Sequence, residues 1–319
     1  MELEFLRPLI KHLPEVDIPK RKVPFKEKLY WTGIILLLFF IMGVIYPYQV
    51  SPELLAEKIS GFDTMTMIFA SSIGSIISVG IGPIVTSSII LQLLSGADMI
   101  KIDLHTKEGK ALFQGTQKIL TVVLAFFEAG ALVYFTGMVS GTGLIAFTVF
   151  QIALGSILLM FMDEVVSKWG IGSGISLFIA GGVSQTIITG SINPMREAGL
   201  FVGAIPSFIQ TMMAGSMNFA IIFPLIGTIL IFLVTAFCES MRLEIPLSYG
   251  GVRGIGGRFP LKFFYVSNIP VILAAALLAN IRMWTGLVGV DISNPPADMS
   301  MIQNIVFQIG RHITVGELY

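Results

Sequence analysis

Long apolar stretches separated by short polar connections run along most of the chain. A helix needs about 20 mostly apolar residues to cross a bilayer. The pattern therefore predicts an all-α fold, a polytopic bundle of membrane helices. Seven stretches qualify or come close: Trp31 to Tyr46, Ile81 to Leu94, Ile119 to Met138, Leu144 to Met162, Ser173 to Ile188, Ala220 to Phe237 and Val266 to Trp284.

Composition agrees with this pattern and excludes several classes of protein. Apolar residues make up 54% of the 319 residues and charged residues 13%, whereas soluble domains carry about 25% charged residues. Lys+Arg and Asp+Glu both total 20, so there is no basic surplus for nucleic acid. The single cysteine, Cys238, excludes an internal disulfide framework and a cysteine-based metal site. We expect no metal, no cofactor and no catalytic residue.

The basic residues predict the orientation of the spans. Sixteen of the twenty Lys and Arg residues fall on one side of the predicted membrane, and that side includes the N-terminal arm. Because basic residues favour the cytoplasmic side, the N-terminus is predicted to be cytoplasmic in a multi-pass protein of the cell membrane. Residues 1–30 would form a cytoplasmic arm. Apolar residues at helical spacing predict a short interfacial helix in it, although Pro8 leaves a frayed tail as the alternative.

The stretch Asp63 to Val79 is too rich in small and polar residues for a comfortable lipid-facing helix. Gly80, Gly82 and Pro83 then break the backbone before the second span continues. Broken backbone at membrane depth is tolerated only inside protein or beside a water-filled cavity. The stretch is therefore predicted to be a re-entrant half-helix that lines or closes a pathway. The alternative is a kinked helix with an extracellular extension.

Two features inside the spans leave alternatives open. Glu128 lies in the middle of the third span, where a carboxyl group is costly and usually functional; the alternative is a structural hydrogen bond to a neighbouring helix. The Gly-rich run Gly170 to Ile175 lacks the Lys-Ser/Thr pair of a phosphate-binding loop, and close helix packing is its plainer interpretation. An intramembrane serine protease is disfavoured because all three histidines lie in predicted loops.

The connection Glu239 to Lys262 has alternating residues around a Gly-rich turn, which predicts a basic hairpin. Such a hairpin suits docking to RNA or to a large acidic partner; the alternative is a loop that only sets topology. The second and seventh spans also share a weak repeat, Gly80 to Val85 and Asn268 to Ile272. Because these spans are predicted to run in opposite directions, the repeat suggests two inverted halves.

These residues resemble the SecY-type channel subunit of the general protein-translocation complex, in particular its archaeal form. The matching stretches occur in the family's order along essentially the whole chain. They are Pro24 to Leu29 with Trp31 to Gly33, Gly80 to Thr86, Leu112 to Gly115, Gly170 to Ile175 and Ser267 to Pro270.

The resemblance implies an hourglass channel of ten spans in two inverted halves, of which about seven spans are present here. Residues 31–190 would form the first half, with the plug at 63–79. Residues 191–319 would form an incomplete second half, with the cytoplasmic hairpin at 239–262 and an outer tail at 285–319. The family's spans eight to ten are expected to be missing.

The resemblance also implies roles for single residues. The apolar pore ring would be formed by Ile81, Val85, Ile175, Ile179 and Ile272. The plug would include Phe69, Ser71, Ser72, Ile73, Gly74 and Ser75. The polar cluster of the lateral gate would be Thr86, Glu128 and Asn268. Docking of a ribosome or motor would involve Arg242, Arg253 and Arg258.

The function so implied is passage of unfolded polypeptides across the membrane, with hydrophobic segments released sideways into lipid and no bond made or broken. The implied partners are a SecE-type subunit, a SecG- or beta-type small subunit, a ribosome or translocation motor, signal sequences, nascent polypeptides and membrane lipid. The alternative is an ion- or solute-coupled secondary transporter, which can also use inverted repeats. Charge-free ring positions disfavour it, because coupling needs ion ligands near the middle of the membrane.

Overall fold

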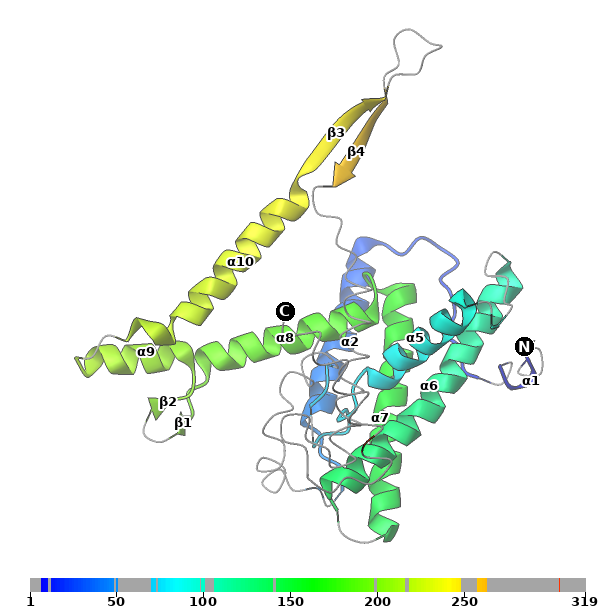
Figure 1. Ribbon diagram of the computed structural model, residues 1–319, viewed down its shortest axis with the longest axis horizontal. Coiled ribbons are helices and arrows are strands. Elements are labelled where there is room, and N and C mark those ends of the chain that lie inside the picture. Colours follow the sequence, from blue (N-terminus) through cyan, green and yellow to red (C-terminus); the bar gives the residue numbers. More distant parts are fainter. Residues whose placement is uncertain are drawn as a thin grey trace. The chain divides into compact units, whose positions relative to one another are not determined.

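Helices make up nearly all of the regular structure in the computed structural model (Figure 1). The structure describes residues 7–10, 13–48, 50, 70–72, 74–97, 99–100, 106–139, 142–197, 200–215, 218–247, 257–262 and 304. In chain order the helices are α1 (Arg7–Ile10), α2 (Phe25–Val44), α5 (Gly82–Gly96), α6 (Lys107–Thr136), α7 (Thr142–Trp169), α8 (Gly174–Ile192), α9 (Ala204–Met213), the 3-10 helix η2 (Phe219–Ile221) and α10 (Phe223–Ser240). Two antiparallel strand pairs complete these elements: β1 (Arg196–Glu197) with β2 (Leu200–Phe201), and β3 (Arg242–Leu247) with β4 (Gly257–Lys262).

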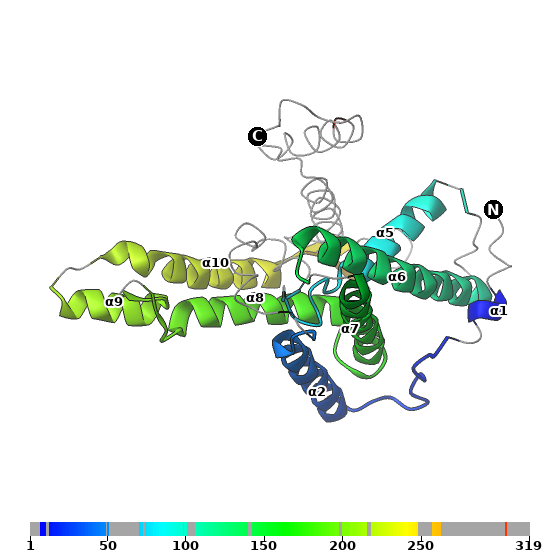
Figure 2. The same cartoon turned by 90° about the horizontal axis from the view of Figure 1, so that it is seen from below.

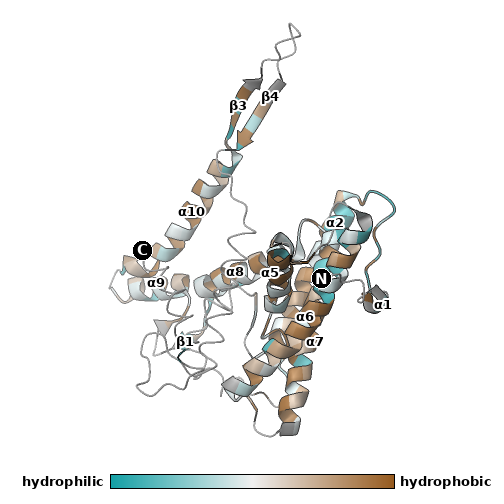
Figure 3. Cartoon of the chain, turned by 45° about the vertical axis from the view of Figure 1, so that its right-hand side comes forward, coloured by the Kyte–Doolittle hydropathy of each residue, from teal (hydrophilic) through white to brown (hydrophobic). Residues whose placement is uncertain are grey.

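The predicted spans can be compared with these helices one by one. Within the described residues, α2, α6, α7, α8 and α10 are long and apolar enough to cross a membrane, and α5 is a shorter apolar helix. Figure 3 shows the apolar residues spread along much of α6, α7 and α10. Six of the seven predicted spans thus coincide with helices, and the seventh, Val266 to Trp284, lies outside the described residues.

Local sequence signals account for where the helices begin and end. Thr106 caps α6, because its side chain accepts a hydrogen bond from the backbone N–H of Gly109 at 3.1 Å. Gly137 ends the same helix with a left-handed backbone, φ 58°. Pro83 and Pro224 stand in the first turns of α5 and α10, where a missing N–H costs nothing.

The helices of the first unit pack around α7. The chain divides into two compact units, residues 1–183 with 270–319, and residues 184–269. In the first unit α7 contacts α2, α5 and α6, and α5 also packs along α6 (Figure 2). Small side chains lie where α6 meets α7. Ala125 and Ala129 of α6 form a buried cluster with Ile152 and Ala153 of α7. Small residues let membrane helices approach closely, which stabilises the pair through dispersion contacts.

The N-terminal arm crosses the ends of α6 and α7. Ile10 of α1 fills the space beside Gly115 of α6, where an added Cβ would lie 2.4 Å from Ile10 Cγ2. Further along, Lys168 of α7 donates hydrogen bonds to Glu15 Oε1 at 3.1 Å and to a backbone carbonyl of the arm. Only Arg7–Ile10 of the predicted interfacial helix is helical among the described residues, and it packs on α6.

In the second unit the described helices are far less covered. α9 packs against β2 and η2, and η2 packs against α10. The apolar window of α10 has 0% of its residues buried, compared with 39% for the windows of α6 and α7. Because exposure of apolar surface to water is unfavourable, the surface of α10 requires lipid or further protein to cover it.

Candidate functional site

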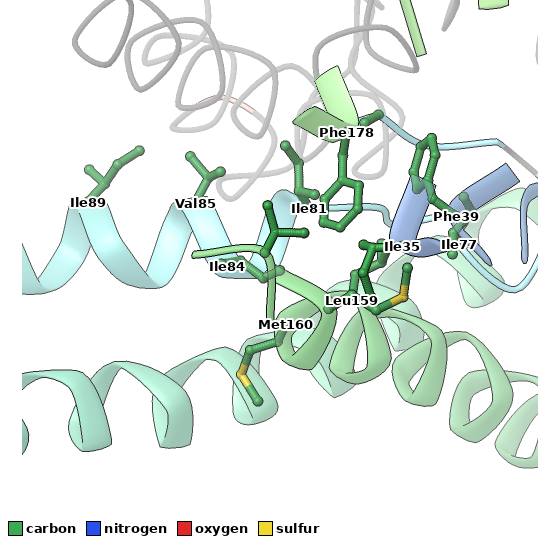
Figure 4. Packing of buried hydrophobic residues seen from close by; sticks show 13 residues of the cluster. Ile35, Phe39, Ile77, Ile81, Ile84, Val85, Ile89, Leu159, Met160 and Phe178 are labelled. Carbon is green, nitrogen blue, oxygen red and sulfur yellow. The ribbon is translucent and has the colours of Figure 1, made fainter. Parts of the chain in front are cut away.

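Four of the five predicted ring residues belong to one apolar cluster. Ile81 and Val85 at the start of α5 are buried, with 0% and 2% of their surface exposed. Ile175 and Ile179 of α8 are partly buried and pack against the same cluster. Figure 4 shows Ile81 and Val85 on one side of α5, as their spacing of four requires, and Ile81 next to the ring of Phe178. We call Ile81, Val85, Ile175 and Ile179 the ring cluster; Ile272 lies outside the described residues.

The stretch directly before α5 is not a helix where the structure describes it. Residues 70–72 and 74–79, which we call the serine segment, form turns and bends. The prediction of a half-helix over Asp63 to Val79 is therefore wrong for this part, while residues 63–69, with Phe69, and Ile73 lie outside the described residues. Gly74 and Ala70 have left-handed backbones, with φ of 93° and 46°, and such a conformation does not continue a right-handed helix.

Serine side chains stabilise this irregular backbone. Ser75 Oγ donates to the carbonyl of Ser72 at 2.6 Å and accepts from the N–H of Ile77 at 3.2 Å. Ser78 Oγ donates to the carbonyl of Ser75 and accepts from the N–H of Gly74 at 3.0 Å. Short hydroxyl side chains compete in this way with helical hydrogen bonding. The described part of the serine segment is therefore internally hydrogen-bonded.

Two of the three predicted lateral-gate residues meet between α5 and α6. Glu128 of α6 is 1% exposed, and the side chain of Thr86 of α5 is its hydrogen-bond partner. Thr86 also donates to the carbonyl of Gly82 at 2.8 Å. Among the described residues, the second carboxyl oxygen of Glu128, Oε1, has no hydrogen-bond partner. Asn268, the third gate residue, lies outside them.

A partly buried carboxylate that the sequence analysis did not single out organises the junction of α7 with α8. Asp163 Oδ1 accepts a hydrogen bond from the N–H of Ile175 at 3.0 Å, at the N-terminus of α8. Gly174 permits this approach, because an added Cβ there would lie 2.7 Å from Asp163 Oδ1. No local sequence signal marks this contact, because Asp163 lies inside α7, twelve residues before Ile175 in the chain.

The other two glycines of this junction, Gly170 and Gly172, occupy positions where a larger residue is disfavoured for two different reasons. Gly172 has a left-handed backbone, φ 77°. Gly170 lies against Thr32 of α2, where an added Cβ would be 3.0 Å from the hydroxyl oxygen. That hydroxyl accepts the N–H of Ile171 at 3.1 Å and donates to the carbonyl of Lys28 at 2.8 Å. Close packing is thus the right interpretation for Gly170 and Gly174, whereas an added Cβ at Gly172 would meet nothing within 4 Å.

We expect Asp163→Ala to lower the thermal stability of the protein, since loss of an N-terminal capping side chain costs about 0.5–2 kcal/mol. Asp163→Asn keeps an oxygen acceptor and should recover most of the loss. Thermal unfolding of the detergent-solubilised protein, followed by tryptophan fluorescence, measures both variants. Equal stability of Asp163→Ala and wild type would contradict the capping role.

The basic connection after α10 forms the predicted hairpin. β3 and β4 pair in antiparallel register from Arg242 opposite Lys262 to Leu247 opposite Gly257. Leu243 and Leu261 face each other on one side of the ladder and are exposed, whereas the register puts positions 242, 258 and 262 on the other side. Arg253 in the turn lies outside the described residues.

In the described part of the chain, no group of three His, Cys, Asp or Glu residues could hold a metal ion. The described part of the site brings together a cluster of branched apolar side chains, the serine segment beside it and the buried carboxyl group of Glu128.

Comparisons with known proteins identify the family of the chain. A sequence model of the SecY family matches residues 75–315, which is most of the chain. The chain belongs to the SecY family. The "Protein translocase subunit SecY" of Methanocaldococcus jannaschii is 49% identical over 280 residues, which cover 88% of this chain and 62% of that protein. The chain thus spans less than two thirds of the length of this SecY relative.

Solved SecY structures resemble the chain in fold. One is a SecY protein whose plug domain is described as stabilising the closed state of the translocation channel and maintaining a membrane seal. It is 46% identical, with a TM-score of 0.74, and covers 89% of this chain and 63% of its own. A second is Sec61 in the canine ribosome-channel complex from the endoplasmic reticulum, 42% identical, with a TM-score of 0.76 over 97% of this chain and 74% of its own.

SecY membership confirms the predicted fold class and the membrane character of the chain. The roles assigned to single residues stay predictions, because a shared fold does not by itself test them. The structure adds to them three features that the sequence analysis missed: the Asp163 cap, the backbone of the serine segment and the amphipathic helix α9.

Proposed function

We propose that the chain forms the central part of a protein-conducting channel that passes unfolded polypeptides across the membrane and releases hydrophobic segments sideways into lipid. The observation that carries this proposal is the ring cluster. Its hydrocarbon side chains come from α5 and α8 and pack in one larger apolar core, which also contains Ile77 of the serine segment. The predicted halves, residues 31–190 and 191–319, are part of the proposal.

An apolar constriction suits a channel whose cargo has no fixed sequence. Branched side chains without hydrogen-bonding groups form a narrow waist that disfavours water and ions. The same side chains yield around a passing polypeptide, because no specific hydrogen bond or ion pair has to break. A coupled secondary transporter needs ion ligands at this depth, and the ring cluster offers none. No catalysed reaction is part of the proposed function.

The channel has to be driven from outside and completed by partners. We propose a ribosome or a translocation motor as the source of energy, docked on the hairpin through Arg242, Arg253 and Arg258. A ribosome-bound Sec61 relative supports this assignment. We propose that a SecE-type subunit and a SecG- or beta-type subunit cover apolar helix faces. The exposed apolar side chains of α10 support this, because they require a partner or lipid.

The proposed location is the cell membrane with a cytoplasmic N-terminus, which places the hairpin inside and the turn after α8 outside. After Cys238→Ser removes the native thiol, a cysteine at Met195 should react with an impermeant maleimide added to intact cells. A cysteine at Leu261 should react only after the cells are opened. Both positions are exposed, at 71% and 37%, so a thiol at either position can react once the reagent reaches its side of the membrane. Labelling of position 261 from outside would contradict the topology.

The test of the function is a translocation assay with the membrane-extracted complex that contains this chain, reconstituted in proteoliposomes. A precursor with a signal sequence should become protected from added protease when the ribosome or motor is supplied. The same precursor without its signal sequence is the matched control. Ion-gradient-driven uptake of a small solute without precursor protection would favour the transporter instead.

A further inference from the structure

Three glycines on three helices surround the serine segment. We propose that Gly43 of α2, Gly155 of α7 and Gly182 of α8 are positioning residues, which seat the serine segment over the ring cluster and set how readily the channel opens. The proposal rests on the proposed function, because it assigns this segment to the closed state of a passage.

Gly155 makes the closest of the three contacts. A Cβ added to it would lie within 3 Å of three atoms of Ile76: the carbonyl oxygen, at 2.1 Å, the carbonyl carbon, at 2.8 Å, and Cγ2, at 2.6 Å. Two of these atoms belong to the backbone, so the contact is not relieved by rotating a side chain. Any residue larger than glycine at position 155 must therefore push the serine segment away from α7.

The backbone of Ile76 also makes a hydrogen bond to the end of α2. Its N–H donates to the carbonyl of Ile45, just after α2, at 2.9 Å. The N–H of Tyr48 donates to Gln151 Oε1 of α7 at 2.9 Å, and Gln151 lies four residues before Gly155 on the same helix face. The end of α2, the serine segment and α7 are thus joined at one place, and a displacement at Gly155 strains all three.

Gly43 and Gly182 contact the segment at ordinary van der Waals distance. A Cβ at Gly43 would lie 3.6 Å from Ile77 Cδ1, and a Cβ at Gly182 would lie 3.7 Å from Ala70 Cα. Ala70 is 2% exposed and keeps a left-handed backbone, which persists only where the surroundings hold it. A methyl group at either glycine fits without displacement and adds contacts, whereas a branched side chain at Gly182 would overlap Ala70.

The internal hydrogen bonds of the serine segment make it respond as one unit. The Ser75 hydroxyl joins the backbone of Ser72 to that of Ile77, and the Ser78 hydroxyl, which follows Ile76, binds the backbone of Gly74 and Ser75, which precede it. A push against Ile76 is therefore passed to Ile77, which belongs to the same apolar cluster as Ile81. A methyl group therefore displaces the serine segment at Gly155 but fits at Gly43 and Gly182, so the same substitution should have different effects at these positions.

The experiment places Gly155→Ala, Gly182→Ala and Gly43→Ala in the reconstituted complex. Gly33→Ala of α2 and Gly143→Ala of α7 are the matched controls, because an added Cβ meets nothing within 4 Å at either position. Amide hydrogen exchange of residues 74–79 measures how firmly the segment is seated, and single-channel recording measures opening without precursor.

Gly155→Ala should speed exchange in residues 74–79 by about tenfold or more and raise resting ion conductance, because overpacking against backbone opens local structure by such factors. Gly182→Ala and Gly43→Ala should leave both readouts at or below wild type, as should the two controls. If Gly155→Ala does not yield a folded complex, Gly182→Val pushes the same segment from α8 and should reproduce the faster exchange and the higher conductance.

Hydrogen exchange at control rates in both Gly155→Ala and Gly182→Val would show that these glycines do not hold the serine segment in place. Faster exchange with conductance at the control level would show that the position of the segment does not set how readily the channel opens. Failure of the wild-type complex to protect a precursor would instead overturn the proposed function, and the exchange data would remain interpretable on their own.

Discussion

Ile81→Asn is expected to raise the resting ion conductance of the reconstituted channel by about tenfold, because an unsatisfied buried amide costs about 1–3 kcal/mol and 1.4 kcal/mol is a factor of ten. Ile81 is fully buried in the cluster that joins α5 and α8. An amide at this position can be satisfied only when water enters, which favours the hydrated, open channel. The same change should relax the demand for a strongly hydrophobic signal sequence.

Ile84→Asn is the matched control for this prediction. Ile84 is 3% exposed and belongs to the same cluster, but it projects from the opposite side of α5, towards Met160 (Figure 4). Ile84→Asn should lower thermal stability about as much as Ile81→Asn does, but it should not raise the conductance to the same extent. Conductance that stays at the wild-type value in Ile81→Asn, or rises equally in Ile84→Asn, would remove the ring assignment.

Glu128→Leu is expected to raise the hydrophobicity that a segment needs for lateral insertion. Glu128 is 1% exposed, and burying a polar group in apolar surroundings costs about 1–3 kcal/mol in mutational data. Interhelical polar contacts in membranes return only about 0.6 kcal/mol on average, so the contact with Thr86 does not offset this cost. An apolar side chain of similar volume should therefore stabilise the closed arrangement of α5 and α6.

A series of test segments with increasing leucine content measures the insertion threshold, and thermal unfolding measures the gain in stability. Glu128→Gln keeps the shape and polarity of the side chain and should remain near the wild-type threshold. A threshold for Glu128→Leu at or below that of wild type would refute the gate role of this residue. The gate role of Asn268, which lies outside the described residues, stays a prediction from the family resemblance.

The spans could be predicted because hydropathy over about 20 residues depends on the bilayer and not on tertiary contacts. Residues 119–138 were expected as the third span, whereas α6 begins at Lys107. Its first turns are polar, so a hydropathy window does not include them, and the Thr106 cap is the signal that marks their start. Helix α9 was missed because ten amphipathic residues are too short for a span.

The site was less predictable, since its details depend on contacts between distant residues. The serine segment has the composition of a helix lined with small residues, but left-handed Gly74 and the serine hydrogen bonds produce turns instead. Asp163 was missed because only the fold brings it to Ile175, twelve residues later in the chain. Thr86 and Glu128 were expected together from the family resemblance, and the packing of α5 on α6 brings them together.

The position of α7 has a consequence for how the protein is made. Helices α2, α5 and α6 all rest on α7, although α7 is the last of the four to leave the ribosome. The serine segment is too polar to remain in lipid, and its seat at Gly155 does not exist until α7 has been synthesised. We therefore expect the nascent chain to keep this segment outside the bilayer, or shielded by an insertion factor, until the fourth helix of the group arrives and completes the assembly in a single step.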